Sequence, residues 1–226
     1  MSSSAKEAIL YRIRTALHDV PPTEQPDDVA ITRAYRQQDD RPHAQVVEQF
    51  VEMTVDYKAI VHHMSEADLP ARIAQSCQDR NLRRLLVPAD LPTAWLPAYE
   101  GLEIVTDDPS HPFANADLDA TDGVLTGCAL AIAQTGTIVL NSGPNQGRRA
   151  ITLIPDYHLC VVYADQVVSI VPEAIAALRS SVVEQGKPLT FISGPSATSD
   201  IELNRVEGVH GPRTLEVIVV ERDPQG

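Results

Sequence analysis

The sequence predicts an α/β fold of three layers, in which a parallel sheet is covered on both faces. Short apolar runs, at residues 85–87, 158–162 and 215–220, are typical of strands buried on both sides. Segments with helical spacing of apolar residues stand between such runs, and this alternation favours a parallel sheet. With 226 residues, of which 43% are hydrophobic, the chain is long enough to bury one core of this kind.

An N-terminal helix is the first predicted element. Ser4 and Glu7 have the spacing of a capping box, and Ile9, Ile13 and Leu17 follow on one side of the helix. Prolines end it, and residues 19–28 form a polar, proline-rich linker. We therefore expect a helix and acidic linker over residues 1–28, and a single α/β domain over residues 29–226.

Within this domain, apolar spacing predicts helices around residues 46–54, 65–77 and 172–181. The remaining apolar segments predict strands at residues 58–62, 85–87, 102–105, 123–126, 137–140, 158–162, 189–192 and 215–220.

Charge and cysteine content exclude several classes of protein. Lys and Arg number 18 against 31 Asp and Glu, a net charge of −13 without a basic run, which excludes a typical nucleic-acid binder. The three cysteines form no CxxC pair, and no HExxH pattern occurs, so a metal site has little support. No segment has the ~18 apolar residues of a membrane span, and the start lacks an apolar signal core. We expect a cytoplasmic protein.

Two glycine-containing segments are candidates for binding. Residues 126–137 contain Thr135 and Gly136 between two strands, where the backbone approaches either a ligand or another part of the core. Residues 141–149 form a polar loop that ends in Arg148 and Arg149, which suits either a phosphate or carboxylate site or a solvated surface loop.

A third segment, residues 191–202, leaves a strand and enters a turn rich in hydroxyl groups. Its backbone N–H groups, together with Ser193, Gly194, Ser196 and Thr198, can form a nest for an anion. Ligands of open α/β sheets bind beyond the carboxyl ends of strands, which is where this loop falls. Asp200 and Glu202 follow, each as a general base or as a helix cap.

A last turn, residues 208–213, places His210 between glycines and Arg213 after a proline. His210 is a candidate acid or base and Arg213 a candidate partner for an anion; the alternative is a hydrogen-bonded turn that leads into the final strand. His62, His63 and His158 are interpreted as strand residues. Arg148, Arg149, Arg205 and Arg213 stand beside glycine-rich loops of an acidic chain, which favours a small anionic ligand over a polyanion.

Together these segments resemble the LUD-domain family, in its lactate-utilisation protein C group (LutC-like). The matching runs are Thr126-Gly-Cys-Ala-Leu-Ala-Ile-Ala-Gln-Thr-Gly-Thr-Ile-Val-Leu140, Ser142-Gly-Pro-Asn-Gln-Gly-Arg148, Pro155-Asp-Tyr-His158, Ile192-Ser-Gly-Pro-Ser-Ala-Thr-Ser-Asp-Ile-Glu202 and Gly208-Val-His-Gly-Pro212. These runs cover about the last hundred residues. Each run alone is weak evidence for the family, whereas the combination is specific for it.

The resemblance implies a fold like that of the NagB/RpiA/CoA-transferase group. It also implies a part in the oxidation of L-lactate to pyruvate, together with partner proteins that carry cysteine-rich and iron–sulfur domains. Three scattered cysteines are too few for a cluster within this chain, so we expect any iron–sulfur cluster to belong to a partner. A nucleotide or flavin cofactor and a homo-oligomeric state are left open.

Two other functions remain as alternatives. One is a stand-alone enzyme of the same fold group, such as a CoA transferase, a sugar-phosphate isomerase or a folate cyclo-ligase; a CoA transferase would use Glu202 or Glu207 as nucleophile. The other is a non-catalytic scaffold that binds a small acid.

Overall fold

The computed structural model describes residues 4–21, 23, 25, 34–199, 205–208 and 210–222, with the backbone alone at 197–199 and 205–207. The chain divides into two compact units, residues 1–35 and 36–226. The boundary expected after residue 28 falls outside the described residues.

The first unit contains helix α1 (Ala5–Ala16). Its predicted capping box is confirmed: the backbone N–H of Ser4 donates to Glu7 at 2.8 Å, and the N–H of Glu7 donates to the Ser4 hydroxyl at 3.3 Å. Local sequence is sufficient for this result because both partners lie within one helical turn.

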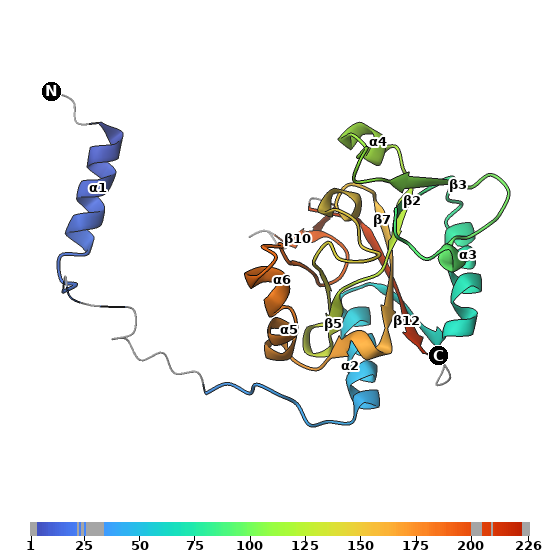
Figure 1. Cartoon of the computed structure of the whole chain (residues 1–226), viewed down its shortest axis with the longest axis horizontal. Helices are drawn as coiled ribbons and strands as arrows, with labels where there is room; N and C mark the ends of the chain where they lie inside the picture. The colour runs from blue at the N-terminus through green and yellow to red at the C-terminus, as the bar shows by residue number, and fades with distance from the viewer. Residues whose placement is uncertain are drawn as a thin grey trace. The chain divides into compact units, whose positions relative to one another are not determined.

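A six-stranded parallel sheet forms the centre of the second unit, with its strands in the order β1-β12-β7-β4-β2-β3 (Figure 1). The most apolar segments are its middle strands, because both of their faces are covered. Its strands are β1 (Ile60–Ser65), β2 (Arg84–Pro88), β3 (Glu103–Asp107), β4 (Gly123–Thr126), β7 (Tyr157–Tyr163) and β12 (Thr214–Glu221).

A second sheet of four strands has the order β8-β5-β6-β9. Its strands are β5 (Leu130–Ile132), β6 (Thr137–Leu140), β8 (Val167–Val168) and β9 (Thr190–Ile192). β5 and β9 both pair antiparallel with β6. The expectation of a single parallel sheet is wrong for these strands, and the sequence pattern does not predict β5 and β8. Antiparallel pairing needs only a tight turn, here the 3₁₀ turn Ala133–Thr135 between β5 and β6.

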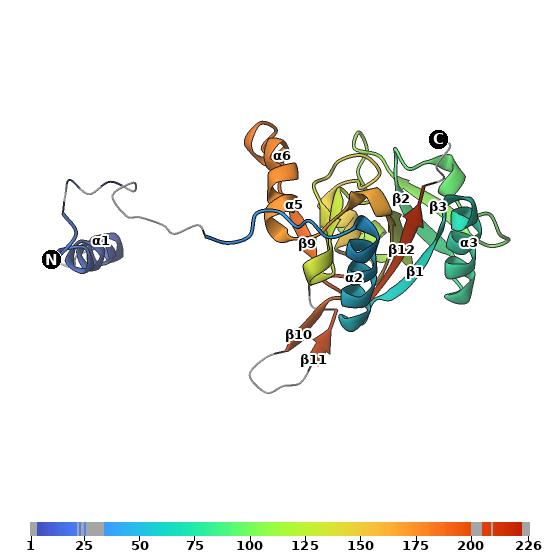
Figure 2. The same cartoon turned by 90° about the horizontal axis from the view of Figure 1, so that it is seen from below.

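Helices cover both faces of the parallel sheet, so the predicted three-layer α/β fold is confirmed. The second unit's helices are α2 (His43–Asp56), α3 (Leu69–Asp79), α4 (Asn115–Asp119), α5 (Val171–Ala177) and α6 (Arg179–Val183). β10 (Ala197–Ser199) and β11 (Arg205–Glu207) form an antiparallel hairpin that extends from this unit (Figure 2).

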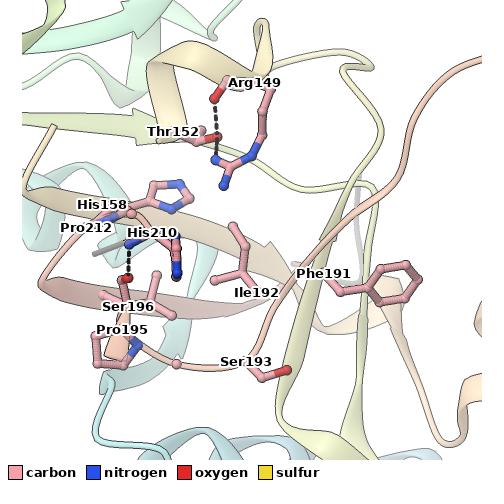
Figure 3. Close-up of a pocket in the computed structure, with 13 residues that line it drawn as sticks. Arg149, Thr152, His158, Phe191, Ile192, Ser193, Pro195, Ser196, His210 and Pro212 are labelled. Carbon is pink, nitrogen blue, oxygen red and sulfur yellow. Dashed lines mark hydrogen bonds between the residues drawn. The ribbon is translucent and has the colours of Figure 1, made fainter. Parts of the chain in front are cut away.

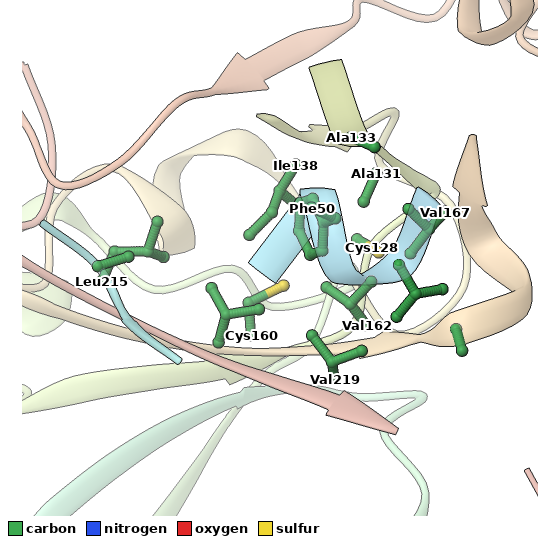
Figure 4. Packing of buried hydrophobic residues seen from close by; sticks show 14 of the residues in the cluster. Phe50, Cys128, Ala131, Ala133, Ile138, Cys160, Val162, Val167, Leu215 and Val219 are labelled. Atoms are coloured by element: carbon green, nitrogen blue, oxygen red, sulfur yellow. The ribbon is translucent and has the colours of Figure 1, made fainter. Parts of the chain in front are cut away.

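Alternate residues of the central strands belong to two separate cores. Cys160 and Val162 of β7 pack with Phe50 of α2 and Ile138 of the small sheet (Figure 4). The neighbouring β7 residues face the opposite way and pack with α3. The period of two along each strand therefore places the small sheet and α2 on one face, and α3 on the other.

One buried carboxylate interrupts the α3 side of the core. Glu216 of β12 accepts hydrogen bonds from Tyr157 at 3.0 Å and from Ser76, and it lies 3.0 Å from His62 Nε2. The guanidinium of Arg80 lies 3.6 Å from Glu216 and stacks on Tyr157, 4.3 Å from the ring centroid. Because its charge and both oxygens have partners, the carboxylate is tolerated in the core.

Candidate functional site

A pocket of about 230 Å³ is lined by residues 191–196 and 210–212, which belong to the predicted segments 191–202 and 208–213, and by Arg149 at the end of the predicted loop 141–149 (Figure 3). It is on the α2 face of the parallel sheet, at the amino ends of β7 and β12. The loop at 193–196 does follow the carboxyl end of β9, as expected, but β9 belongs to the small sheet. The lining residues are Arg149, Thr152, His158, Phe191, Ile192, Ser193, Gly194, Pro195, Ser196, His210, Gly211, Pro212 and Leu215.

Arg149 supplies the positive charge of this pocket. It begins the 3₁₀ turn Arg149–Thr152, and its Nη1 donates to the hydroxyl of Thr152 at 3.1 Å. Burial lowers the pKa of Arg149, although an arginine remains protonated at any physiological pH. No carboxylate within the described ranges pairs with it. A partly desolvated guanidinium without an anionic partner is suited to binding an anion from solution.

His158 forms part of the pocket wall from β7, and it is only 1% exposed. Its Nε2 lies 2.8 Å from the hydroxyl of Thr126 on the adjacent strand β4. Its Nδ1 is buried and has no hydrogen-bond partner among the described residues. The interpretation of His158 as a strand residue is therefore correct, and His158 in addition lines the pocket.

Ser193 lies at the end of a line of hydroxyl groups. The Oγ1 of Thr137 is 2.7 Å from the Oγ of Ser193 and 2.7 Å from the Oγ1 of Thr135. Thr135 does not line the pocket itself, but it is one hydrogen bond behind a residue that does. This line of hydrogen bonds fixes the side chain of Ser193, a residue that lines the pocket.

Two motif glycines pack against the carboxyl end of α2. Gly136 has φ +55°, and an added Cβ would lie 2.7 Å from the backbone of Met53. Gly194 has φ +86°, and an added Cβ would lie 2.7 Å from the backbone oxygen of Tyr57. Both positions require glycine because the turn is left-handed and the helix is in the way. For Gly136, the core-crossing interpretation is thus the one that the structure supports.

Ser196 and His210 join the loop to the last turn of the chain. The hydroxyl of Ser196 accepts a hydrogen bond from the backbone N–H of His210 at 2.9 Å, and the N–H of Ser196 donates to Pro212 at 2.8 Å. The His210 side chain is exposed and lines the pocket. Ser196 therefore holds the turn together, while the His210 ring can contact a ligand.

Arg148 and Arg213 lie away from this pocket. Arg148 makes a bidentate pair with buried Asp107, with Nε 2.8 Å and Nη2 2.9 Å from the two carboxylate oxygens. Arg213 pairs with Asp156 at 2.7 Å in an exposed position, and it lines a different hollow. Neither contributes to the walls around Arg149.

Several candidates lie outside the described residues or side chains. Asp200 and Glu202 fall in the undescribed segment, and the side chains of Thr198, Arg205 and Glu207 are likewise not described.

Two residues that line the pocket are not among the site residues predicted from the sequence, His158 and Arg149. Both stand in motifs that carry the family resemblance or a predicted loop, the run Pro155–His158 and the polar loop 141–149. A usable signal was the lone histidine at the start of the apolar run 159–162, since a buried polar side chain needs a partner.

The cysteines lie in the interior. Burial raises the pKa of Cys77 to about 12, and Cys128 and Cys160 are both buried in the core beside α2. No cluster of three or more His, Cys, Asp or Glu side chains that could hold a metal ion is found in the described part of the chain. None of its helices is long and apolar enough to cross a membrane.

Comparison with known proteins places the chain in a family. Residues 47–220 match the LUD domain. A lactate utilization protein C of Deinococcus radiodurans is 52% identical over 177 residues, which span 78% of this chain and 80% of that protein. Another, from Geobacillus kaustophilus, is 36% identical over 110 residues and is covered over 45% of its length.

The fold is shared with a solved structure as well. The crystal structure of a DUF162 family protein from Deinococcus radiodurans, 44% identical, has a TM-score of 0.68 and covers 80% of this chain and 99% of its own. The resemblance inferred from the motifs is confirmed: the chain belongs to the LUD-domain family.

Proposed function

We propose that this protein is a component of a lactate-utilisation system that oxidises L-lactate to pyruvate together with iron–sulfur partner proteins. We further propose that the pocket around Arg149, here called the Arg149 pocket, holds the small carboxylate. The proposed role rests on the relative named lactate utilization protein C, which is 52% identical over most of both chains. The proposed ligand rests on the pocket itself.

The observation that supports an anionic ligand most directly is the environment of Arg149. Its guanidinium is partly desolvated and, among the described side chains, donates to the neutral Thr152 hydroxyl rather than to a carboxylate. Arg148, next to it, is already neutralised by Asp107. A carboxylate ligand therefore gains a charge-assisted hydrogen bond at Arg149 without displacing an internal ion pair.

The size of the pocket favours a small acid. Sites for drug-sized ligands have volumes of about 300–1,000 Å³, whereas the Arg149 pocket has about 230 Å³. This volume fits lactate or pyruvate better than it fits a CoA ester or a folate.

Around the ligand, we assign roles to the residues that line the pocket. Ser193 and the backbone of Gly194 lie beside the ligand, and His210 is the exposed acid or base candidate at the rim. Asp200, Glu202 and Thr198 remain proposed site residues on the adjoining segment, with Asp200 and Glu202 as candidate bases. Oxidation of a 2-hydroxy acid releases two electrons and two protons, and the iron–sulfur partners would accept the electrons.

Genetic complementation tests this function. Deletion of the gene is expected to abolish growth on L-lactate but not on glucose, and the wild-type gene should restore it. Arg149→Met should fail to restore growth although the protein accumulates. Arg213→Met is the matched control, because it removes an exposed arginine outside the pocket. Normal growth of the deletion strain on L-lactate would refute the role.

The same experiment separates a binding role from a scaffold. Full restoration of growth by Arg149→Met would show that the system does not need the pocket, which would leave a scaffold function. Cell fractionation of the tagged protein tests the proposed cytoplasmic location, and co-purification with iron–sulfur proteins tests the proposed partners.

A further inference from the structure

His158 presents a buried polar atom that the protein itself does not satisfy. The side chain is 1% exposed, and its Nδ1 has no hydrogen-bond partner among the described residues. A buried polar group that is left without a hydrogen bond destabilises the folded state. In a folded protein such an atom is usually satisfied by a water or a ligand, and the ring of His158 lines a pocket that can hold either.

The ring is held in place from behind. Its Nε2 lies 2.8 Å from the Thr126 hydroxyl, and the two residues are on neighbouring strands of the parallel sheet. Cys160, two residues further along β7, is fully buried on the same face. Because strand pairing and core packing fix this ring, its unpartnered nitrogen is preorganised rather than free to find a protein partner.

Arg149 and His158 belong to the same pocket and come from different segments. In Figure 3, the guanidinium of Arg149 extends toward the side of the pocket where the His158 ring lies. One group carries a full positive charge and suits a carboxylate. The other is a single hydrogen-bonding nitrogen and suits one further oxygen. The pair therefore fits a carboxylate that carries a second polar atom close to the first.

We propose that the Arg149 pocket selects 2-hydroxy and 2-oxo monocarboxylates, with the carboxylate on Arg149 and the oxygen at C2 hydrogen-bonded to Nδ1 of His158. This inference rests on the proposed function for the presence of a carboxylate. It goes further by assigning the discrimination at C2 to His158, as a specificity-determining residue.

The Thr126 hydroxyl explains how one histidine can form a hydrogen bond with both the 2-hydroxy acid and the 2-oxo acid. A hydroxyl group can donate to Nε2 or accept from it. When Thr126 donates, Nδ1 carries the proton and donates to a 2-oxo group. When Thr126 accepts, Nδ1 has a lone pair and accepts from a 2-hydroxy group. A change of the His158 tautomer, in which the ring proton moves between Nδ1 and Nε2 and the Thr126 hydroxyl rotates to match, thus adapts the pocket to a 2-hydroxy acid and to the corresponding 2-oxo acid.

Binding measurements on the full chain test this inference. L-lactate, pyruvate and propionate are titrated by calorimetry or by protein-observed NMR; propionate has the same carbon chain but no oxygen at C2. Because an analogue that lacks the C2 oxygen leaves Nδ1 unpaired, L-lactate and pyruvate should bind at least about 10-fold more tightly than propionate. Equal binding of all three acids would overturn the inference. A water molecule would then be the hydrogen-bond partner of Nδ1 in each complex.

Variants locate the discrimination. The amide of glutamine can take the place of Nε2 and keep the contact with Thr126, so His158→Gln should fold while losing Nδ1. It is expected to bind L-lactate only as tightly as propionate, with propionate affinity unchanged. His63→Gln is the control, because this histidine pairs with Glu221 on the surface. Retained preference for L-lactate in His158→Gln would refute the role of His158.

Failure of this inference can be told apart from failure of the proposed function. If none of the three acids binds, the carboxylate site itself is wrong. If all three bind equally and Arg149→Met abolishes their binding, the carboxylate site stands and only the role of His158 is wrong. Ring ¹⁵N shifts of His158 in wild-type protein give a readout that needs no variant: Nδ1 should shift with L-lactate and not with propionate.

Discussion

Replacing Arg148 by methionine should destabilise the protein because it leaves the carboxylate of Asp107 buried and unpaired. The Asp107 side chain is 2% exposed, and Arg148 binds both of its oxygens, at 2.8 and 2.9 Å. Removing one partner of a buried ion pair costs about 3–5 kcal/mol. Because the Arg148 side chain is 35% exposed, water screens part of this interaction, so we expect a loss of about 2–4 kcal/mol.

The pH dependence of this loss follows from the pKa of Asp107. Burial by itself raises that pKa, but the hydrogen bonds from Arg148 and from the backbone N–H of Phe113 outweigh burial and lower it. A lowered pKa in the folded state stabilises the wild-type protein above the unfolded value near 3.9, and this stabilisation is lost as pH falls through the folded pKa. Without Arg148, burial should raise the pKa instead. The deficit of the variant should therefore be largest at neutral pH and shrink as pH falls through the raised pKa of Asp107 in the variant, so that it is already smaller at pH 4.

Urea denaturation measures this prediction through the fluorescence of Trp95, the one tryptophan, which is buried in the second unit. The free energy of unfolding is compared at pH 7 and at pH 4 for wild-type protein, Arg148→Met and Arg84→Met. Arg84 pairs with exposed Glu103, so its loss should cost less than about 1 kcal/mol. If Arg148→Met were no more destabilising than Arg84→Met, the reasoning on Asp107 would be refuted.

Three further predictions concern stability and reactivity. Glu216→Ala removes the acceptor of a buried network and should lower the free energy of unfolding by about 2–4 kcal/mol in urea denaturation; a loss under 1 kcal/mol would contradict it. Gly136→Ala meets the backbone of α2 and should cost more than about 2 kcal/mol, whereas Gly101→Ala, with open space around it, should cost about 1 kcal/mol in the same assay. The Cys77 thiol should resist alkylation at pH 8 until urea unfolds the protein, since burial raises its pKa to about 12; mass spectrometry of its peptide measures this, and rapid labelling of native protein would disprove it.

Elements with a strong local pattern were predictable from the sequence. The helix around Phe50, the strand at residues 123–126 and the capping box at Ser4 all form as predicted. Each depends on neighbours within a few positions, through helical spacing, an unbroken apolar run or a hydrogen bond across three residues.

The division into two sheets was not predictable in the same way. β6 is as apolar and as buried as β4, yet it pairs antiparallel in the small sheet. Burial of a strand depends only on what covers it, so periodicity cannot say which sheet it joins. The three-residue strand β5 also lies in a segment that glycines mark as a turn, which concealed it.

The sequence by itself determined the family, the α/β class and the loops that border the candidate pocket, because these follow from local patterns and from motif residues. Only the tertiary structure decided which side chains line the pocket and are available there as charged or hydrogen-bonding groups. Arg148 and Arg149 are adjacent and chemically identical, yet one is neutralised by Asp107, 41 residues away, while the other lines the pocket. His158 likewise acquires an unpartnered nitrogen only because Thr126 of the adjacent strand occupies the other. Charge pairing and burial depend on residues distant in the chain, and only folding brings them together.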